Sequence, residues 1–255
     1  MRQTLLLLPA LFVLAAAAAG FSAEHKDPAG FSFRYPDEWV AVTGLNEGML
    51  QPAVRDWLKQ GEVDFSRIDV IVVDPRQTDF FANCNVLRVP GELAVTEATR
   101  QKLLKEAAEQ FQSAGVEVEN LRIDVRRFGM HEAIVFDFDS RMPFLQERLH
   151  QRQAHFPGGG QTHVVTCSAP AGRFPQYEQP FDMLLSSFHV PPRQSTGFDW
   201  KNVRSSATTG AIIGGLAGAV AVLLQQFKKK KVPAPATPAP DPAPTPDGEA
   251  GAGGS

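Results

Sequence analysis

A stretch of 23 residues without a charged side chain, residues 205–227, places the strongest limit on how this chain can fold. It lies between Arg204 and Lys228 and includes the apolar or glycine run 211–224. A helix of this length would extend about 34 Å at ~1.5 Å rise per residue, and a hydrocarbon core is roughly 30 Å thick. We therefore expect one C-terminal transmembrane helix over residues 205–227. A glycine-rich helix packed against the folded domain, or lying at the membrane interface, is the alternative.

Residues 1–23 have the pattern of a secretory signal peptide. Arg2 is followed by the almost wholly apolar run 5–19 and then by small residues. An uncleaved anchor is the alternative interpretation. Four consecutive lysines, residues 228–231, follow the predicted span, and positive charge beside a span stays on the cytoplasmic side. Both ends of the chain thus predict a single-pass protein of the inner (cytoplasmic) membrane, with a periplasmic or otherwise extracytoplasmic domain and a cytoplasmic C-terminal tail.

Between these segments, residues 24–192 are long enough for one exported domain that buries roughly 70% of its unfolded surface. Residues 193–204 form a linker to the span. Residues 228–255 form a basic stop and then a Pro- and Ala-rich tail, which has too little apolar surface to fold and is expected to be disordered. From residue 24 to residue 207 there are 20 basic and 25 acidic side chains, and this acidic balance argues against a nucleic-acid partner.

Three glycines recur at every fourth residue inside the predicted span: Gly210, Gly214 and Gly218. This spacing places small residues on one face of a helix, where a second helix can approach closely. We interpret them as a helix-packing face for self-association or for a partner's span. The general abundance of small residues in membrane helices is the alternative. The expected partners are therefore membrane lipid and, through the span, a protein partner or a second copy.

The hydrophobic pattern of the domain predicts the order strand, strand, helix, two strands, helix, four antiparallel strands, helix. The expected helices cover residues 49–58, a segment capped by Thr96 and ended by Gly115, and residues 181–188. An antiparallel β-sheet flanked by helices buries these apolar faces most simply, so the expected fold class is α+β.

Two hairpins are predicted near the end of the domain. In the first, antiparallel pairing places Ile123 beside Phe136 and Val125 beside Ile134 on the core side. The same register places Arg122 beside Asp137 outside. The second hairpin turns at residues 157–160, where three consecutive glycines predict a mobile tip.

Two segments resemble the PsbP/Mog1-type domain. They are Gly-Phe-Ser-Phe-Arg-Tyr-Pro-Asp-Glu-Trp at residues 30–39, and Phe-Asp-Met-Leu-Leu-Ser-Ser-Phe at residues 181–188, just after a hairpin. The resemblance covers most of residues 24–192 and implies an α/β/α sandwich. It also implies binding or assembly, since the family includes extrinsic photosystem proteins, a nuclear-transport GTPase cofactor and bacterial envelope proteins. The glycine-rich span and the proline-rich tail depart from the family's usual domain-only pattern.

Cys84 and Cys167 are the only cysteines, and an exported domain lies where disulfides persist. Both fall in or near predicted strands. A bridge requires those strands to be neighbours with Cα atoms about 5.5 Å apart. Two small buried thiols are the alternative.

Arg148, His150 and Arg152 alternate along one predicted strand and form a candidate anion-binding patch; ordinary solvated residues are the alternative. His155 and His163 lie nearby, but no carboxylate or cysteine has a recognised ligand spacing, so no metal site is expected. Asp137 and Asp139 share one strand face, where we expect surface salt bridges.

No nucleophile elbow and no phosphate-binding loop occur in the sequence, and no catalytic or cofactor-binding residue is assigned. The leading hypothesis is a membrane-anchored, non-enzymatic binding or assembly module of the cell envelope. The alternatives are an envelope enzyme of unrecognised type that uses the region of His150 and Arg152, and a structural oligomer organised by the glycine-rich span.

Overall fold

The computed structural model describes residues 23–44, 68–76, 82–113, 116–141 and 147–194. In chain order the strands are β1 (Ala23–Lys26), β2 (Ser32–Tyr35), β3 (Val40–Thr43), β4 (Ile68–Val73), β5 (Asn83–Pro90), β6 (Glu117–Phe128), β7 (His131–Arg141), β8 (Leu149–Gly158) and β9 (Gln161–Pro170). The helices are α2 (Glu97–Ser113), the short 3-10 helix η3 (Phe174–Gln176) and α3 (Glu178–Ser187).

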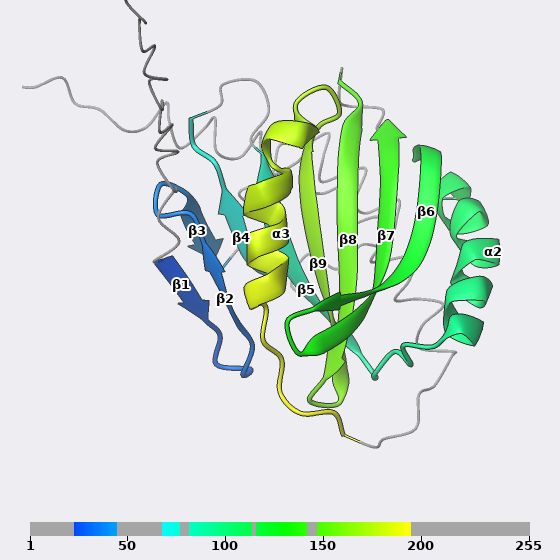
Figure 1. Cartoon of the computed structure of the whole chain (residues 1–255), viewed down its shortest axis with the longest axis horizontal. Coiled ribbons are helices and arrows are strands. Elements are labelled where there is room, and N and C mark those ends of the chain that lie inside the picture. Colours follow the sequence, from blue (N-terminus) through cyan, green and yellow to red (C-terminus); the bar gives the residue numbers. More distant parts are fainter. Residues whose placement is uncertain (1–22, 45–67, 77–81, 114–115, 142–146, 195–255) are drawn as a thin grey trace, which may run out of the picture.

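Seven of the strands form one antiparallel sheet in the order β3-β4-β5-β9-β8-β7-β6 (Figure 1). Strands β1 and β2 form a separate two-stranded sheet beside α3. The expected α+β class with an antiparallel sheet and helices is confirmed. Strand β6 lies at one edge of the large sheet. It carries alternating charges, which discourage pairing with another chain.

The two long helices pack on opposite faces of the sheet. Successive residues of a strand point to opposite faces, and in β7 Val135 belongs to the core beneath α3 whereas Ile134 and Phe136 belong to the core beneath α2. Helix α3 buries side chains at helical spacing, namely Phe181, Leu184 and Leu185. Burial of each such large apolar side chain contributes about 1.5–3 kcal/mol. The two helices therefore hold the sheet from both sides.

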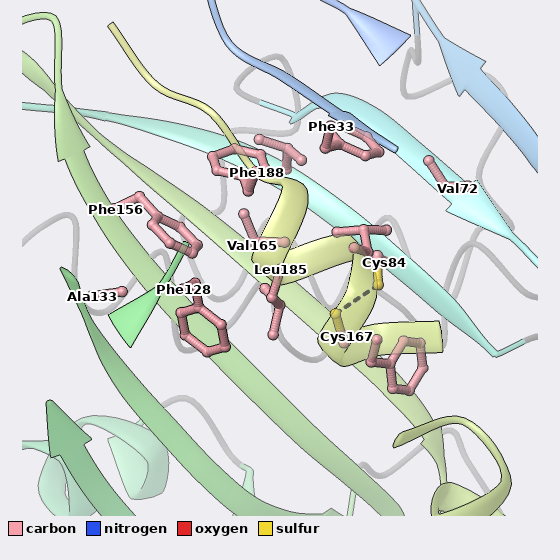
Figure 2. Packing of buried hydrophobic residues seen from close by; sticks show 14 of the residues in the cluster. Phe33, Val72, Cys84, Phe128, Ala133, Phe156, Val165, Cys167, Leu185 and Phe188 are labelled. Carbon is pink, nitrogen blue, oxygen red and sulfur yellow. Dashed lines mark hydrogen bonds between the residues drawn. The ribbon is translucent and has the colours of Figure 1, made fainter. Parts of the chain in front are cut away.

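The core beneath α3 combines aromatic rings with aliphatic side chains (Figure 2). Phe188 stacks on Phe33 of β2 with ring centroids 5.8 Å apart and lies 4.9 Å from the ring of Phe156 of β8. These contacts join the small sheet, the end of α3 and the large sheet into one core.

The predicted register of the first hairpin is confirmed, with Ile123 opposite Phe136 and Arg122 opposite Asp137. Two burial expectations are wrong. Val125 is 40% exposed. Arg100, in the first turn of α2, donates to the carbonyl oxygen of Ile123, and Val125 lies two residues nearer the hairpin turn, beyond this end of the helix. Asp137 is only 2% exposed, because its strand face is the one that α3 and its neighbours cover.

The glycine turn of the second hairpin is packed, contrary to the expected mobile tip. Gly159 and Gly160 form a two-residue turn with φ of +66° and +79°, which suits glycine. The Gly159 N–H donates to the carbonyl oxygen of Pro192 at 3.0 Å, and the Gly160 N–H donates to Glu92 Oε1 at 2.8 Å. The turn thus holds the segment that leaves α3.

Thr96 caps α2 as predicted, since its hydroxyl accepts a hydrogen bond from the Thr99 N–H at 3.2 Å. The predicted helix 49–58, the predicted span 205–227 and the predicted tail lie outside the described residues. The described part begins at Ala23, the last residue assigned to the signal peptide, which pairs with Tyr35 in the small sheet. Among the described residues, no helix combines the length and apolar character needed to cross a membrane.

Candidate functional site

Two residues of the predicted anion patch, His150 and Arg152, lie on β8, and the third, Arg148, directly precedes it; the structure pairs all three with carboxylates. Arg152 lies opposite Asp137 of β7 and contacts it at 3.1 Å through Nε, while its Nη1 lies 2.7 Å from Asp182 of α3. Arg148 pairs with Glu119 of β6 at 2.9 Å. The predicted patch is therefore an ionic network that ties β6, β7, β8 and α3 together.

His150 lies at the centre of this network. Its Nε2 is 2.8 Å from Asp137 and its Nδ1 is 2.7 Å from Asp139. Burial opposes the charged ring, but the hydrogen bonds to the two aspartates outweigh it and raise the pKa of His150. Burial likewise opposes the charge on Asp137, but His150 and Arg152 hold the pKa of that carboxyl well below its usual range. The expected pairing of Asp137 with Arg122 is present at 3.5 Å.

One member of the network, Asp182, could not be predicted from the sequence pattern. Asp182 belongs to α3, 30 residues beyond Arg152, and only the packing of the helix on the sheet brings the two side chains together. Arg152 also lies over the ring of Phe174, 5.5 Å from its centroid. These contacts give the network a structural role in docking α3.

Cys84 and Cys167 are directly opposite each other in neighbouring strands β5 and β9. Both side chains point into the core beneath α3 and are at most 1% exposed, with the two Sγ atoms 2.6 Å apart (Figure 2). Burial is the main cause that raises the pKa of the Cys84 thiol. The neighbouring-strand placement that a bridge requires is therefore met.

The histidines considered for a metal site do not converge. His155 faces the α2 side of the sheet, whereas His150 faces the α3 side. Burial lowers the pKa of His155 to about 3 and that of His163 to about 4, so both rings are neutral at pH 7. No group of three or more metal-ligating side chains occurs in the described part of the chain. The glycines of the predicted span, Gly210, Gly214 and Gly218, lie outside it.

Two rows of uncharged polar side chains run across the α2 side of the central strands, a feature the sequence reasoning missed. In the first row, Gln151 accepts from the Ser140 hydroxyl and donates to Ser168, each at 3.1 Å. In the second, Gln153 donates to Thr166 at 3.1 Å and contacts His155 Nε2 at 2.9 Å. Amide and hydroxyl residues at alternate positions of three strands were the available signal.

Asn85 extends the second row, because it lies opposite Thr166 in the β5–β9 pair. Its side chain is 1% exposed, and neither its Oδ1 nor its Nδ2 has a hydrogen-bond partner among the described residues. A buried amide without partners costs roughly 1–3 kcal/mol. The Asn85 amide can hydrogen-bond an uncharged polar group. Among the side chains of the two rows, it is the one whose burial costs the most free energy.

A pocket of about 300 Å³ lies where the β6–β7 turn meets the residues after α3, 188–194, which we call the departing segment. Arg127, His131 and Glu132 line it from the hairpin, and Pro192 and Arg193 line it from the departing segment. His131 Nε2 lies 3.4 Å from Nδ1 of the neighbouring His189. Burial, followed by the charges of His189 and Arg193, lowers the pKa of His131. This pocket could not be predicted from the sequence, because His131 and His189 on its two sides are 58 residues apart in the chain.

No protein-family model matches the chain, and no curated protein matches its sequence. Solved structures do match. The domain is similar in fold to PsbP. Cyanobacterial PsbP (CyanoP) from Synechocystis sp. PCC 6803 matches with a TM-score of 0.47 at 17% identity, over 69% of this chain and 95% of that one. LpqN, involved in cell envelope biogenesis of Mycobacterium tuberculosis, matches with a TM-score of 0.39 at 11% identity, over 67% of this chain and 91% of LpqN. The similarity to both structures concerns the fold alone.

Proposed function

We propose that the protein is a membrane-anchored, non-enzymatic binding or assembly module whose folded domain lies outside the cytoplasm. The observation that carries this proposal is the way the chain leaves the domain. The Gln194 N–H donates to Glu92 Oε1 at 2.8 Å, so the last described residue is held on the body of the domain. Ten residues, 195–204, then remain before the uncharged segment and its four lysines. A domain held this close to a span is displayed at the membrane surface.

The ionic network gives the region of His150 and Arg152 a structural role rather than a catalytic one. A general acid or base has to exchange protons with a substrate. His150 is instead hydrogen-bonded through both ring nitrogens, and Arg152 joins a buried carboxylate to α3. We assign these side chains to the stability of the sheet and helix.

The membrane anchor is tested by alkaline carbonate extraction of the full chain from isolated membranes. We expect the full chain to remain in the membrane pellet and a variant that lacks residues 205–227 to be released. Release of the full chain would contradict the proposal. A variant in which glutamines replace lysines 228–231 is the control, because it keeps the apolar segment and should stay in the pellet.

The binding role is tested by crosslinking in intact cells, followed by identification of the crosslinked partner. We expect a specific envelope partner to be captured by the full chain and lost when the domain is unfolded by a core substitution such as Phe181→Ala. Turnover of a substrate by the purified chain, abolished by His150→Ala without loss of folding, would instead favour the enzyme hypothesis.

A further inference from the structure

We infer that the pocket between the β6–β7 turn and the departing segment rests against the bilayer and takes the phosphate of an anionic phospholipid headgroup. This inference rests on the proposed membrane anchor. The partner of the pocket is then the membrane surface.

The pocket is lined by more basic than acidic side chains. Eight of the twelve arginines in the described residues form an ion pair with a carboxylate. Arg127 and Arg193 line the pocket and have no carboxylate partner within the described part of the chain. Glu132 is the acidic side chain of the lining, so the two arginines leave the pocket with a net positive charge.

The basic groups of the pocket have the chemistry to bind a phosphate. A guanidinium presents a planar fork of N–H donors that matches phosphate oxygens. His131 and its neighbour His189 add ring nitrogens beside the arginines. A volume of about 300 Å³ is large enough for a phosphate group and part of its glycerol. The walls thus suit a phosphodiester better than an uncharged ligand.

The pocket lies at the end of the domain from which the chain leaves toward the predicted span. Arg193 is one residue from Gln194, where the described chain ends. Ten extended residues reach at most about 36 Å, so this end of the domain cannot move far from the bilayer. In Figure 1 the β6–β7 turn, the β8–β9 turn and the departing segment gather at the same end of the sheet.

An exposed apolar side chain lies at the rim of the pocket. Met130, at the β6–β7 turn, is 80% exposed, the largest exposure among the large hydrophobic residues of the described part. An apolar side chain flanked by basic groups is typical of a surface that enters the headgroup layer. Phosphate contacts by the arginines and shallow insertion of Met130 therefore act together.

The test uses the full chain in vesicles, with an environment-sensitive fluorophore on a Met130→Cys variant and a lipid-borne quencher. The native cysteines are buried, so the label goes to position 130. The same label on Arg141→Cys, at the opposite end of β7, is the control for the hydrophobicity of the dye. The vesicles contain phosphatidylcholine alone or with 30% phosphatidylglycerol.

We expect quenching at position 130 only in the anionic vesicles, and little at position 141. One basic residue near an anionic surface is worth about fivefold in binding, so Arg127→Gln with Arg193→Gln should weaken docking about 25-fold. The matched pair Arg34→Gln with Arg141→Gln, also arginines without a described ion pair, should leave it unchanged. Equal quenching in both vesicles, or docking that survives the loss of Arg127 and Arg193, would overturn the inference.

Two further measurements separate the possible failures. Inorganic phosphate at 10 mM should compete only weakly with the vesicle surface; full competition would assign the pocket to a free anion and overturn the membrane partner. Carbonate extraction of the same vesicles reports on the anchor alone. If the chain is released, arginine-dependent quenching of the unanchored chain would still support the pocket, and its absence would reject it.

Discussion

Gly158 lies against Pro191 with no room for a side chain between them. A Cβ atom at position 158 would stand 2.3 Å from the Pro191 carbonyl oxygen and 2.9 Å from Cγ2 of Val190. The β8–β9 hairpin and the segment after α3 therefore meet backbone to backbone. This contact directs the chain along the end of the sheet, past the pocket and toward the predicted linker.

Replacement of Gly158 by alanine should displace the departing segment. Because the clash involves backbone, we expect Gly158→Ala to lower the free energy of unfolding by about 1–3 kcal/mol. It should also speed trypsin cleavage after Arg193. Gly172→Ala is the matched control, since nothing lies within 4 Å of a Cβ at that position. Equal cleavage rates in the two variants would show that the contact does not hold the segment.

Cys84 and Cys167 should be joined by a disulfide if the domain lies outside the cytoplasm, as proposed. Their placement opposite each other in adjacent antiparallel strands brings the two side chains to one face, as a bridge requires. The bridge would close a loop of 83 residues and stabilise the fold by about 4.5 kcal/mol. Alkylation of the denatured protein should modify neither cysteine before reduction and both after it. Modification of both without reductant would contradict the prediction.

His150 should make stability depend on pH. Its pKa in the folded protein is raised above the ordinary value of 6.5, so its contribution is complete below about pH 6.5 and is lost as pH rises through the folded pKa. We expect His150→Gln to cost about 1.5–3 kcal/mol at pH 5.5 and clearly less at pH 9, measured by urea unfolding. Arg148→Gln removes an exposed pair and should cost less than about 1 kcal/mol at both pH values. A loss for His150→Gln that grows toward pH 9 would reverse the assigned sign.

The polar rows should respond in opposite directions to two similar substitutions. Asn85→Leu removes a buried amide without partners in the described structure, and should raise the free energy of unfolding by about 1 kcal/mol. Gln153→Leu should lower it by about 1–3 kcal/mol, because Thr166 and His155 lose their partner. Thermal unfolding of both variants checks the contrast. Destabilisation by Asn85→Leu would indicate that Asn85 has a bound partner in the protein as purified.

Local patterns predicted the elements of the domain well. Alternation of apolar and polar residues determined the pairing of Ile123 with Phe136, and the cap at Thr96 and the spacing of Phe181, Leu184 and Leu185 located the two helices. Each of these features depends on residues close together in the chain.

Features that depend on tertiary packing were not predictable in this way. Asp137 is buried because α3 covers its face of the sheet. It pairs with Arg152 because β8 lies beside β7, and the order of strands in the sheet is set by tertiary packing. The pocket requires the segment after α3 to return to the β6–β7 turn. The alternation of residue types predicted a strand at Gln151 and Gln153, but it did not indicate that both side chains are buried.

The orientation of the chain is tested most directly by protease added to spheroplasts that carry the full protein with an epitope at its C-terminus. We predict that the protease degrades the domain of residues 24–192 and leaves a membrane-bound fragment that keeps the epitope, with Arg204 as the last tryptic site before the uncharged segment. Loss of the epitope while the domain remains intact would contradict the account.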